Sequence, residues 1–235
     1  MELSKRLTAV AGMVTKGNVV CDVGCDHGYV SIYLVQRGIS SHVIAMDVRK
    51  GPLSHAEDHI HMYGLCDYIE TRLSDGVDEL KEGEADTLIL AGMGGRLMEG
   101  IITRGITKVH KLKELVLQPQ SEIGLFRKFL RESGFVIVDE DMVYEDGKYY
   151  PLMRAVTGKQ KTQPDSVQKL YDLYGELLLN NQHPILKQYL ESQNKKLSLL
   201  LRELTDISAE SEKSKKRISE VENELLLNQM AWERY

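Results

Sequence analysis

The most constraining feature of this chain is an apolar run at residues 19–23 that passes through two glycines, Gly24 and Gly28, into a second apolar segment at 30–34. The first run predicts a buried strand and the second predicts a helix. Glycine permits a sharp turn and the close approach of a ligand, and the start of a helix offers unpaired backbone N–H groups. The pattern therefore predicts an α/β chain with a ligand site at this turn, although a turn that binds nothing would share it.

Two acidic residues, Asp22 and Asp26, stand in this turn, which has the spacing Asp-x-Gly-x-x-x-Gly. Their carboxylates would repel the pyrophosphate of a dinucleotide, because like charges at close range cost free energy. They suit a ligand that carries a cationic amino group, such as S-adenosylmethionine.

The composition excludes several classes of protein. With 235 residues, of which 42% are hydrophobic, the chain can form one domain with a sizeable core and an appendage. No apolar run reaches the length of a membrane span, and the N-terminus has no signal-peptide core. Cys21, Cys25 and Cys66 are odd in number and form no Cys-x-x-Cys pair, so we expect a cytoplasmic protein without a disulfide framework or a zinc site.

Three histidines, His55, His59 and His61, lie close together in the sequence. The first two have the i, i+4 spacing that could hold a metal ion, but no third ligand is evident near them. We therefore expect a solvated helix face and no metal.

Strands alternate with helices over the first two thirds of the chain. We expect strands at 19–23, 42–47, 68–73, 86–91 and 114–117. Helices are expected at 3–14, at 52–63, within 101–107 and at 121–133, the last with Ser121 as its N-cap. Two further β-runs, 135–143 and 149–156, are joined by Glu145-Asp146-Gly147-Lys148, which predicts a hairpin. This order predicts a mostly parallel sheet with helices on both faces and an antiparallel edge.

Polar or glycine-rich turns follow four of these strands, at 22–28, Asp47, Asp75-Gly76 and 92–95. Ligands of doubly wound sheets bind at the carboxyl ends of the strands, and an acid at the position of Asp47 suits the hydroxyls of a ribose. Any one of these acids could simply form a turn. Their occurrence at successive strand ends favours a shared ligand site.

The order of these turns resembles that of class I S-adenosylmethionine-dependent methyltransferases. More narrowly, Asp-Val-Gly-Cys-Asp-His-Gly-Tyr (22–29), Ala-Gly-Met-Gly-Gly (91–95) and Leu-Gln-Pro-Gln (117–120) resemble the bacterial tRNA (adenine-22-N1)-methyltransferase family over the whole chain. The Asn/Asp-Pro-Pro-Tyr of enzymes that methylate exocyclic amines is replaced here by Gly92-Met93-Gly94-Gly95, which fits a ring-nitrogen target. The resemblance implies methyl transfer from S-adenosylmethionine to N1 of an adenine in tRNA, at adenine 22.

The resemblance also implies roles for individual residues. Asp22 and the 24–28 backbone should hold the methionine moiety, Asp47 the ribose hydroxyls, and Asp75 with the N–H of Gly76 the adenine. The full set of expected cofactor residues is Asp22, Gly24, Cys25, Gly28, Asp47, Val48, Asp75, Gly76, Gly92, Met93 and Gly94. Because the methylated base is cationic, we expect Asp26 to stabilise it, and His27 and Tyr29 to orient or stack on it, although these two could instead cap and pack the helix.

The net charge of −5 requires that tRNA meet a local basic surface. Residues 96–131 hold eight Lys/Arg and only three acids. A solvated helix face would have the same composition. The expected RNA contacts are Arg96, Arg104, Lys108, Lys111, Arg127, Lys128 and Arg131.

Beyond residue 158 the sequence predicts a separate helical region. Residues 159–165 are typical of a linker, and a helix at 167–179 is followed by a break at 180–184. Heptad-like spacing from Leu186 to Asn228 predicts a coiled coil, which we interpret as two antiparallel helices reversing near Thr205-Asp206. One continuous helix that dimerises is the alternative, and a monomer is favoured.

We therefore predict a Rossmann-like methyltransferase domain at 1–160 and a helical coiled-coil tail at 161–235. A small-molecule methyltransferase is the second hypothesis. The third is a non-catalytic cofactor-binding adaptor that docks a partner through the tail.

Overall fold

The computed structural model describes residues 1–159, 163–207 and 212–235. The chain divides into two compact units, Met1–Thr162 and Gln163–Tyr235, close to the boundary expected at residue 160.

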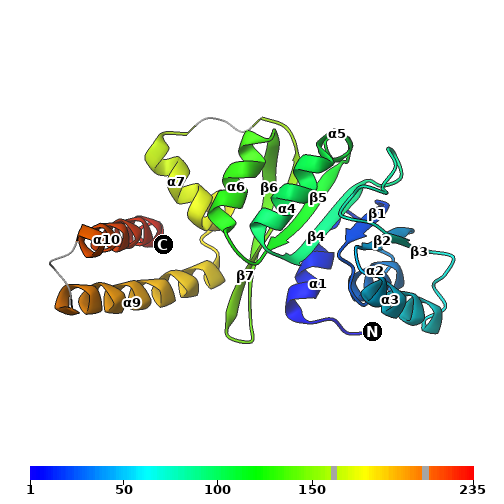
Figure 1. Ribbon diagram of the computed structural model, residues 1–235, viewed down its shortest axis with the longest axis horizontal. Helices are drawn as coiled ribbons and strands as arrows, with labels where there is room; N and C mark the ends of the chain where they lie inside the picture. The colour runs from blue at the N-terminus through cyan, green and yellow to red at the C-terminus, as the bar shows by residue number, and fades with distance from the viewer. Residues whose placement is uncertain (160–162, 208–211) are drawn as a thin grey trace. The chain divides into compact units, whose positions relative to one another are not determined.

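The first unit is built on a seven-stranded sheet with the order β3-β2-β1-β4-β5-β7-β6 (Figure 1). Its strands are β1 (Val20–Val23), β2 (Val43–Asp47), β3 (Ile69–Leu73), β4 (Thr87–Met93), β5 (Glu114–Pro119), β6 (Phe135–Glu145) and β7 (Lys148–Thr157). Strands β1 to β5 pair in parallel, whereas β7 pairs antiparallel with both β5 and β6. This arrangement confirms the predicted Rossmann-like sheet with an antiparallel edge hairpin.

Six helices in the described part of this unit cover the two faces of the sheet. They are α1 (Lys5–Gly12), α2 (Tyr29–Gln36), α3 (Lys50–Met62), α4 (Gly95–Arg104), α5 (Ile106–Val109) and α6 (Ile123–Glu132).

The central strands are buried on both faces because their side chains alternate between two apolar cores. Cys21, Ile44 and Leu88 point to the core shared with α4, α5 and α6. Val20 and Ala45 point to the core shared with α1, α2 and α3. The strand order reverses between β1 and β4, which is the position where doubly wound sheets bind their ligands.

Two helices begin at other residues than the sequence predicts. The helix expected within 101–107 starts at Gly95 and ends at Arg104, because Gly105 interrupts it before α5. Ser121 is not the N-cap of α6. The N-cap is Glu122 in a left-handed conformation (φ 52°), and its side chain makes no capping hydrogen bond.

The second unit is helical, as predicted. It contains α7 (Asp165–Tyr174), α8 (Glu176–Asn180), α9 (Pro184–Ile207) and α10 (Glu212–Trp232). The single helix expected at 167–179 is divided by Gly175, whose φ of 90° is incompatible with a continuous helix.

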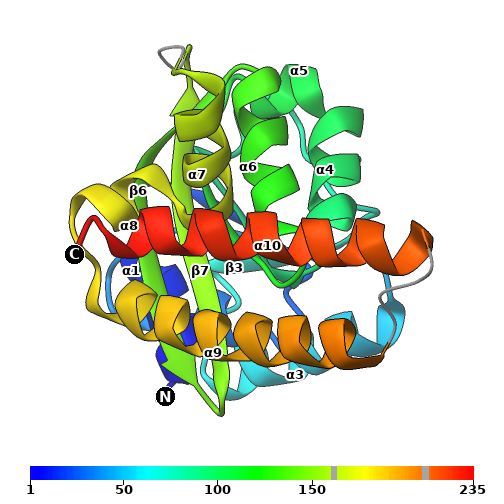
Figure 2. The same cartoon turned by 90° about the vertical axis from the view of Figure 1, so that its left-hand side faces the viewer.

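Helices α9 and α10 form an antiparallel hairpin, in agreement with the favoured prediction (Figure 2). Asn228, which is 1% exposed, donates to the carbonyl of Leu190 and accepts from the side chain of Asn194. At the same end of the hairpin, just before α9 and just after α10, the hydroxyl of Tyr235 donates to the carbonyl of His183. Thr205 and Asp206 belong to α9, so the chain does not reverse there. Residues 208–211, which follow α9, lie outside the described residues.

No helix in the described part of the chain is long and apolar enough to cross a membrane.

Candidate active site

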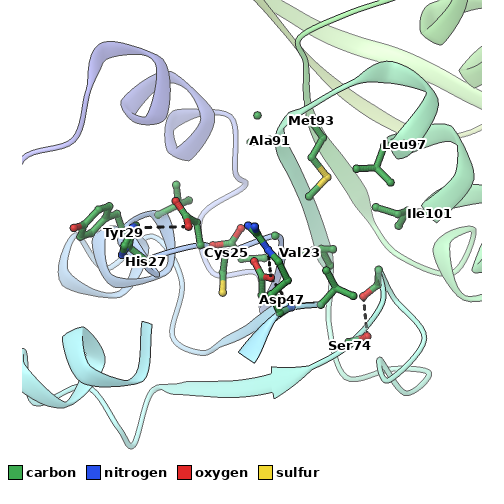
Figure 3. Close-up of a pocket in the computed structure, with 18 of the residues that line it drawn as sticks. Val23, Cys25, His27, Tyr29, Asp47, Ser74, Ala91, Met93, Leu97 and Ile101 are labelled. Carbon is green, nitrogen blue, oxygen red and sulfur yellow. Dashed lines mark hydrogen bonds and ion pairs between the residues drawn. The ribbon is translucent and has the colours of Figure 1, made fainter. Parts of the chain in front are cut away.

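The carboxyl ends of β1, β2, β3 and β4 surround a cavity of about 540 Å³ (Figure 3). Of the predicted site residues, the cavity is lined by Asp22, Gly24, Cys25, Asp26, His27, Tyr29, Asp47, Val48, Asp75, Gly76, Gly92 and Met93. The strand ends that the sequence singled out therefore do converge on one site.

The turn after β1 is held against β2, because the backbone N–H groups of Gly24 and Cys25 both donate to the carbonyl of Met46. Gly24 has a φ of 73°, and a Cβ built on it would lie 2.2 Å from Cε of Met93. The positive φ favours glycine here, and a larger residue would also require the flexible end of the Met93 side chain to move.

Two predicted cofactor residues, Gly28 and Gly94, do not line the cavity. Gly28 is the N-cap of α2, and its missing side chain lets α3 approach, since a Cβ there would lie 3.2 Å from Cβ of Ala56. Gly94 is the N-cap of α4, and a Cβ on it would lie 2.9 Å from Oγ of Ser121. Both glycines allow neighbouring segments of the protein to pack closely.

Asp22 is a buried carboxylate at the base of the cavity. It is 4% exposed and accepts a hydrogen bond of 2.7 Å from the hydroxyl of Ser31 in α2. Burial raises the pKa of the Asp22 carboxyl to about 6, despite the opposing effect of the Ser31 hydrogen bonds. Such a carboxylate gains a partner when a cationic group enters the cavity.

Asp47 is the last residue of β2 and is 6% exposed. Its Oδ1 accepts a hydrogen bond of 2.9 Å from the backbone N–H of Arg49. This contact orients the carboxylate while leaving Oδ2 for a ligand that carries hydroxyl groups (Figure 3).

The turn after β3 is organised by Ser74, whose hydroxyl donates to the carbonyl of Gly76 at 2.9 Å. Asp75 accepts two hydrogen bonds of 2.7 Å from the guanidinium of Arg104. This fork lowers the pKa of Asp75 below its ordinary value. Arg104, which was expected to contact RNA, holds a carboxylate at the cavity.

The carboxyl end of β4 contains a bulge between Ala91 and Met93, and Gly92 there has a φ of 78°. The side chain of Met93 points into the cavity opposite Cys25 (Figure 3). Leu97 and Ile101 of α4 complete the apolar wall. These two residues were not predicted from the sequence, although their i, i+4 spacing directly after the glycine turn could have indicated them.

Asp26, His27 and Tyr29 form the mouth of the cavity. Asp26 is held at a φ of 50°, and its side chain is 65% exposed, 3.8 Å from Nε2 of His27. The ring of Tyr29 stacks on His27 and on His59 of α3, with centroids 5.4 and 5.1 Å apart. The expectation of a solvated histidine face is therefore wrong for His59, although His55 and His61 are exposed.

The expected RNA-contacting residues make contacts within the protein. Arg127 is wrong as an RNA contact, because it is 4% exposed and ion-paired with the buried Glu140. The side chains of Arg96, Lys111 and Lys128 are more than half exposed and pair with Glu122, Glu82 and Glu132. Lys108 donates to the carbonyls of Val77 and Asp78, and Arg131 lies half-buried in the last turn of α6.

Arg6 of α1 also lines the cavity, together with Leu7 and Gln120, and none of the three was predicted from the sequence. Arg6 lies off the apolar face of its helix, so periodicity gives no reason to choose it. Only the tertiary fold brings α1 to the ends of β4 and β5.

The hydrogen-bond acceptors and the apolar side chains that line the cavity fit S-adenosylmethionine. Acceptors lie at the ends of β1, β2 and β3, where an amino group, ribose hydroxyls and an adenine amino group need them, and Met93, Leu97 and Ile101 offer an apolar wall. Among the described residues, no group of three or more His, Cys, Asp or Glu side chains could hold a metal ion.

Comparison with known proteins agrees with this geometry. A family model described as a methyltransferase domain matches residues 3–153. The tRNA (adenine(22)-N(1))-methyltransferase of Bacillus subtilis is 31% identical over 97% of this chain and 95% of its own length.

Two solved structures share the fold over both units. The crystal structure of the Bacillus subtilis m1A22 tRNA methyltransferase has a TM-score of 0.87 and 28% identity, covering 98% of this chain and 99% of the other. A Streptococcus pneumoniae protein assigned as a tRNA (m1A22) methyltransferase and crystallised with S-adenosyl-L-methionine has a TM-score of 0.86 and 29% identity, covering 98% and 100%. This chain therefore belongs to the methyltransferase family that includes the tRNA (adenine(22)-N(1))-methyltransferase of Bacillus subtilis.

Proposed function

We propose that this chain transfers the methyl group of S-adenosylmethionine to N1 of adenine 22 in tRNA. The observation that carries the proposal is the convergence of Asp22, Asp47 and Asp75, from three successive strand ends, on one cavity. The activity named for the Bacillus subtilis relative, which matches nearly the whole chain, supports the substrate and the position.

The cofactor would lie across the strand ends in the order of the sheet. Asp75 and the N–H of Gly76 receive the adenine, and Asp47 receives the ribose hydroxyls. Asp22 and the turns at Gly24 and Gly92 receive the methionine part. This order follows the strand order β3-β2-β1-β4 and requires no crossing of the ligand over itself.

Bound S-adenosylmethionine supplies an electrophilic methyl group. Adenine N1 carries an in-plane lone pair, so no base is needed to deprotonate it, and the protein mainly positions the two reactants. The methylated base is cationic, and the exposed carboxylate of Asp26 is our candidate for stabilising that charge. The stacked rings of His27 and Tyr29 would receive a base that has left its stack in the tRNA.

For the tRNA we propose contacts from Arg96, Lys108, Lys111, Lys128 and Arg131 of the basic segment, with the helical unit as a second contact. The ion pairs that Arg96, Lys111 and Lys128 make are exposed, and exposed pairs contribute little free energy. A phosphate can therefore replace their carboxylate partners. We also propose that the protein is cytoplasmic, since its three cysteines are all free. We propose a monomer, since α9 and α10 bury Leu190 and Val221 within one chain.

The test is nucleoside analysis by mass spectrometry after incubation with S-adenosylmethionine and unmodified tRNA. We expect 1-methyladenosine as the product. Methylation of a small-molecule acceptor instead of tRNA would favour the second hypothesis. Cofactor binding without any transfer would favour the adaptor.

A further inference from the structure

A cationic residue on α1 has no role in the mechanism so far. Arg6 lines the cavity near the ends of β4 and β5, on the far side of β1 from Asp47 and Asp75. We propose that Arg6 binds the carboxylate of the methionine moiety of S-adenosylmethionine. This assignment rests on the proposed function and adds a recognition residue to it.

The side chain of Arg6 is held in place by contacts from two strands, β5 and β7. Its Nη1 donates to Oε1 of Gln118 at 3.0 Å, and its guanidinium carbon lies 5.5 Å from the centre of the Tyr150 ring. Oε1 of Gln118 also accepts the backbone N–H of Gly92 at 3.2 Å. Gln118 is fully buried, so its amide is a fixed bridge between the guanidinium and the β4 turn.

The charges of the cavity leave few places for an anionic group. Asp22, Asp26, Asp47 and Asp75 all line it, and each would repel a carboxylate. Among the described residues that line the cavity, the side chains that are always cationic at neutral pH are those of Arg6 and Arg49. Arg49 lies 4.0 Å from Oδ1 of Asp47, at the ribose end.

The order of the ligand along the sheet points to the same residue. If the adenine lies at β3 and the ribose at β2, the amino-acid end of the cofactor extends past β1 toward β4 and β5. Arg6 is adjacent to Gly92, since a Cβ built on that glycine would lie 3.6 Å from Nη1 of Arg6. The ammonium would then face Asp22, and the carboxylate would face the guanidinium, with no like charges in contact.

Arg6 is less suited to the target base, because a guanidinium beside a base that becomes cationic would oppose the reaction. A phosphate of the tRNA is the competing occupant. Binding of the cofactor carboxylate can be distinguished from binding of a tRNA phosphate. Some cofactor analogues lack the carboxylate, whereas a contact with phosphate does not depend on the cofactor.

The test is calorimetric binding of two ligands to wild type and to Arg6→Ala. The first ligand is S-adenosylhomocysteine, which carries the amino-acid carboxylate, and the second is 5′-methylthioadenosine, which lacks the amino-acid group. We expect Arg6→Ala to bind S-adenosylhomocysteine roughly 10- to 100-fold more weakly and methylthioadenosine with unchanged affinity. Unchanged binding of methylthioadenosine also shows that the variant is folded.

Lys5→Ala is the matched control, because it removes an exposed cation from the neighbouring position of the same helix. It should leave the affinity for both ligands unchanged. Equal weakening of both ligands in Arg6→Ala would overturn the proposal. So would unchanged binding of both, and if that variant then bound tRNA weakly, Arg6 would be a phosphate contact. A wild type that bound neither ligand would refute the proposed function itself.

Discussion

At Asp22 the requirements of stability and of ligand binding conflict. The side chain is 4% exposed, and burial raises its pKa to about 6, so the ionised carboxylate costs folding free energy. The cost is absent below the unfolded pKa, near 4, and grows as the pH rises to about 6. A bound ammonium group would offset it.

Asp22→Asn should therefore stabilise the ligand-free protein at pH 8, by roughly 1–3 kcal/mol, and should weaken cofactor binding. The amide can still accept the Ser31 hydrogen bond. Thermal unfolding of both proteins between pH 4 and pH 8 checks this, and the difference in Tm should shrink toward pH 4. A difference that does not change with pH would show that ionisation of Asp22 is not its cause. In wild type, cofactor affinity should fall as the pH drops below about 6.

Asp47→Ala should lose at least tenfold in affinity for S-adenosylmethionine, since it removes the acceptor proposed for the ribose hydroxyls. Calorimetry on the folded variant provides the measurement. Unchanged affinity would remove Asp47 from the site.

Asp26→Asn separates catalysis from binding, because it keeps the shape of the side chain and removes its charge. Turnover should fall while cofactor affinity changes much less. Equal losses in both would make Asp26 a cofactor residue, and full activity would make it structural.

At the scale of single elements, the turn after β1 makes the site possible. Gly24→Ala places a methyl group where Cε of Met93 lies and forces an alanine into a φ of 73°. We expect loss of cofactor binding together with a destabilisation of about 1–2 kcal/mol.

Gly38→Ala is the control for that substitution, because Gly38 has a φ of 60° and open space around its Cβ position. It should have a similar effect on stability and none on cofactor binding. If both variants bind the cofactor as tightly as wild type does, the contact between the β1 and β4 turns is not needed for cofactor binding.

The elements also indicate how much of the structure could be predicted. Local signals were sufficient for β1, β2 and β4, whose apolar runs end in an acid or a glycine, and for the β6–β7 hairpin. They failed at Ser121, since a capping residue type does not fix where a helix begins, and at Gly175, which divided an amphipathic run.

The site was predictable where ligand contacts follow strands and unpredictable where tertiary packing decides. Asp22, Asp47 and Asp75 stand directly at strand ends. Arg6 reaches the cavity from another helix, and Arg127 is buried against Glu140 of β6, the strand that follows its helix. Composition alone could not reveal that the basic segment contains both buried and paired residues.

At the scale of the whole molecule, the two units allow their roles to be separated. Residues 1–159 contain the complete cavity, so this fragment should fold and bind S-adenosylmethionine as the full chain does. It should methylate tRNA poorly if the helical unit contacts the substrate. Cofactor calorimetry and tRNA affinity across a salt series give the comparison. Normal methylation by the fragment would show that the helical unit is not a substrate arm.

The central claim, methylation of adenine 22 at N1, is tested most directly by mapping the methyl group in an unmodified tRNA transcript by mass spectrometry. A second transcript with guanine at position 22 provides the control. We predict 1-methyladenosine at position 22 of the first transcript and no methylation of the second. A methyl group at N6, at another position, or in equal amount on both transcripts would contradict the proposed function.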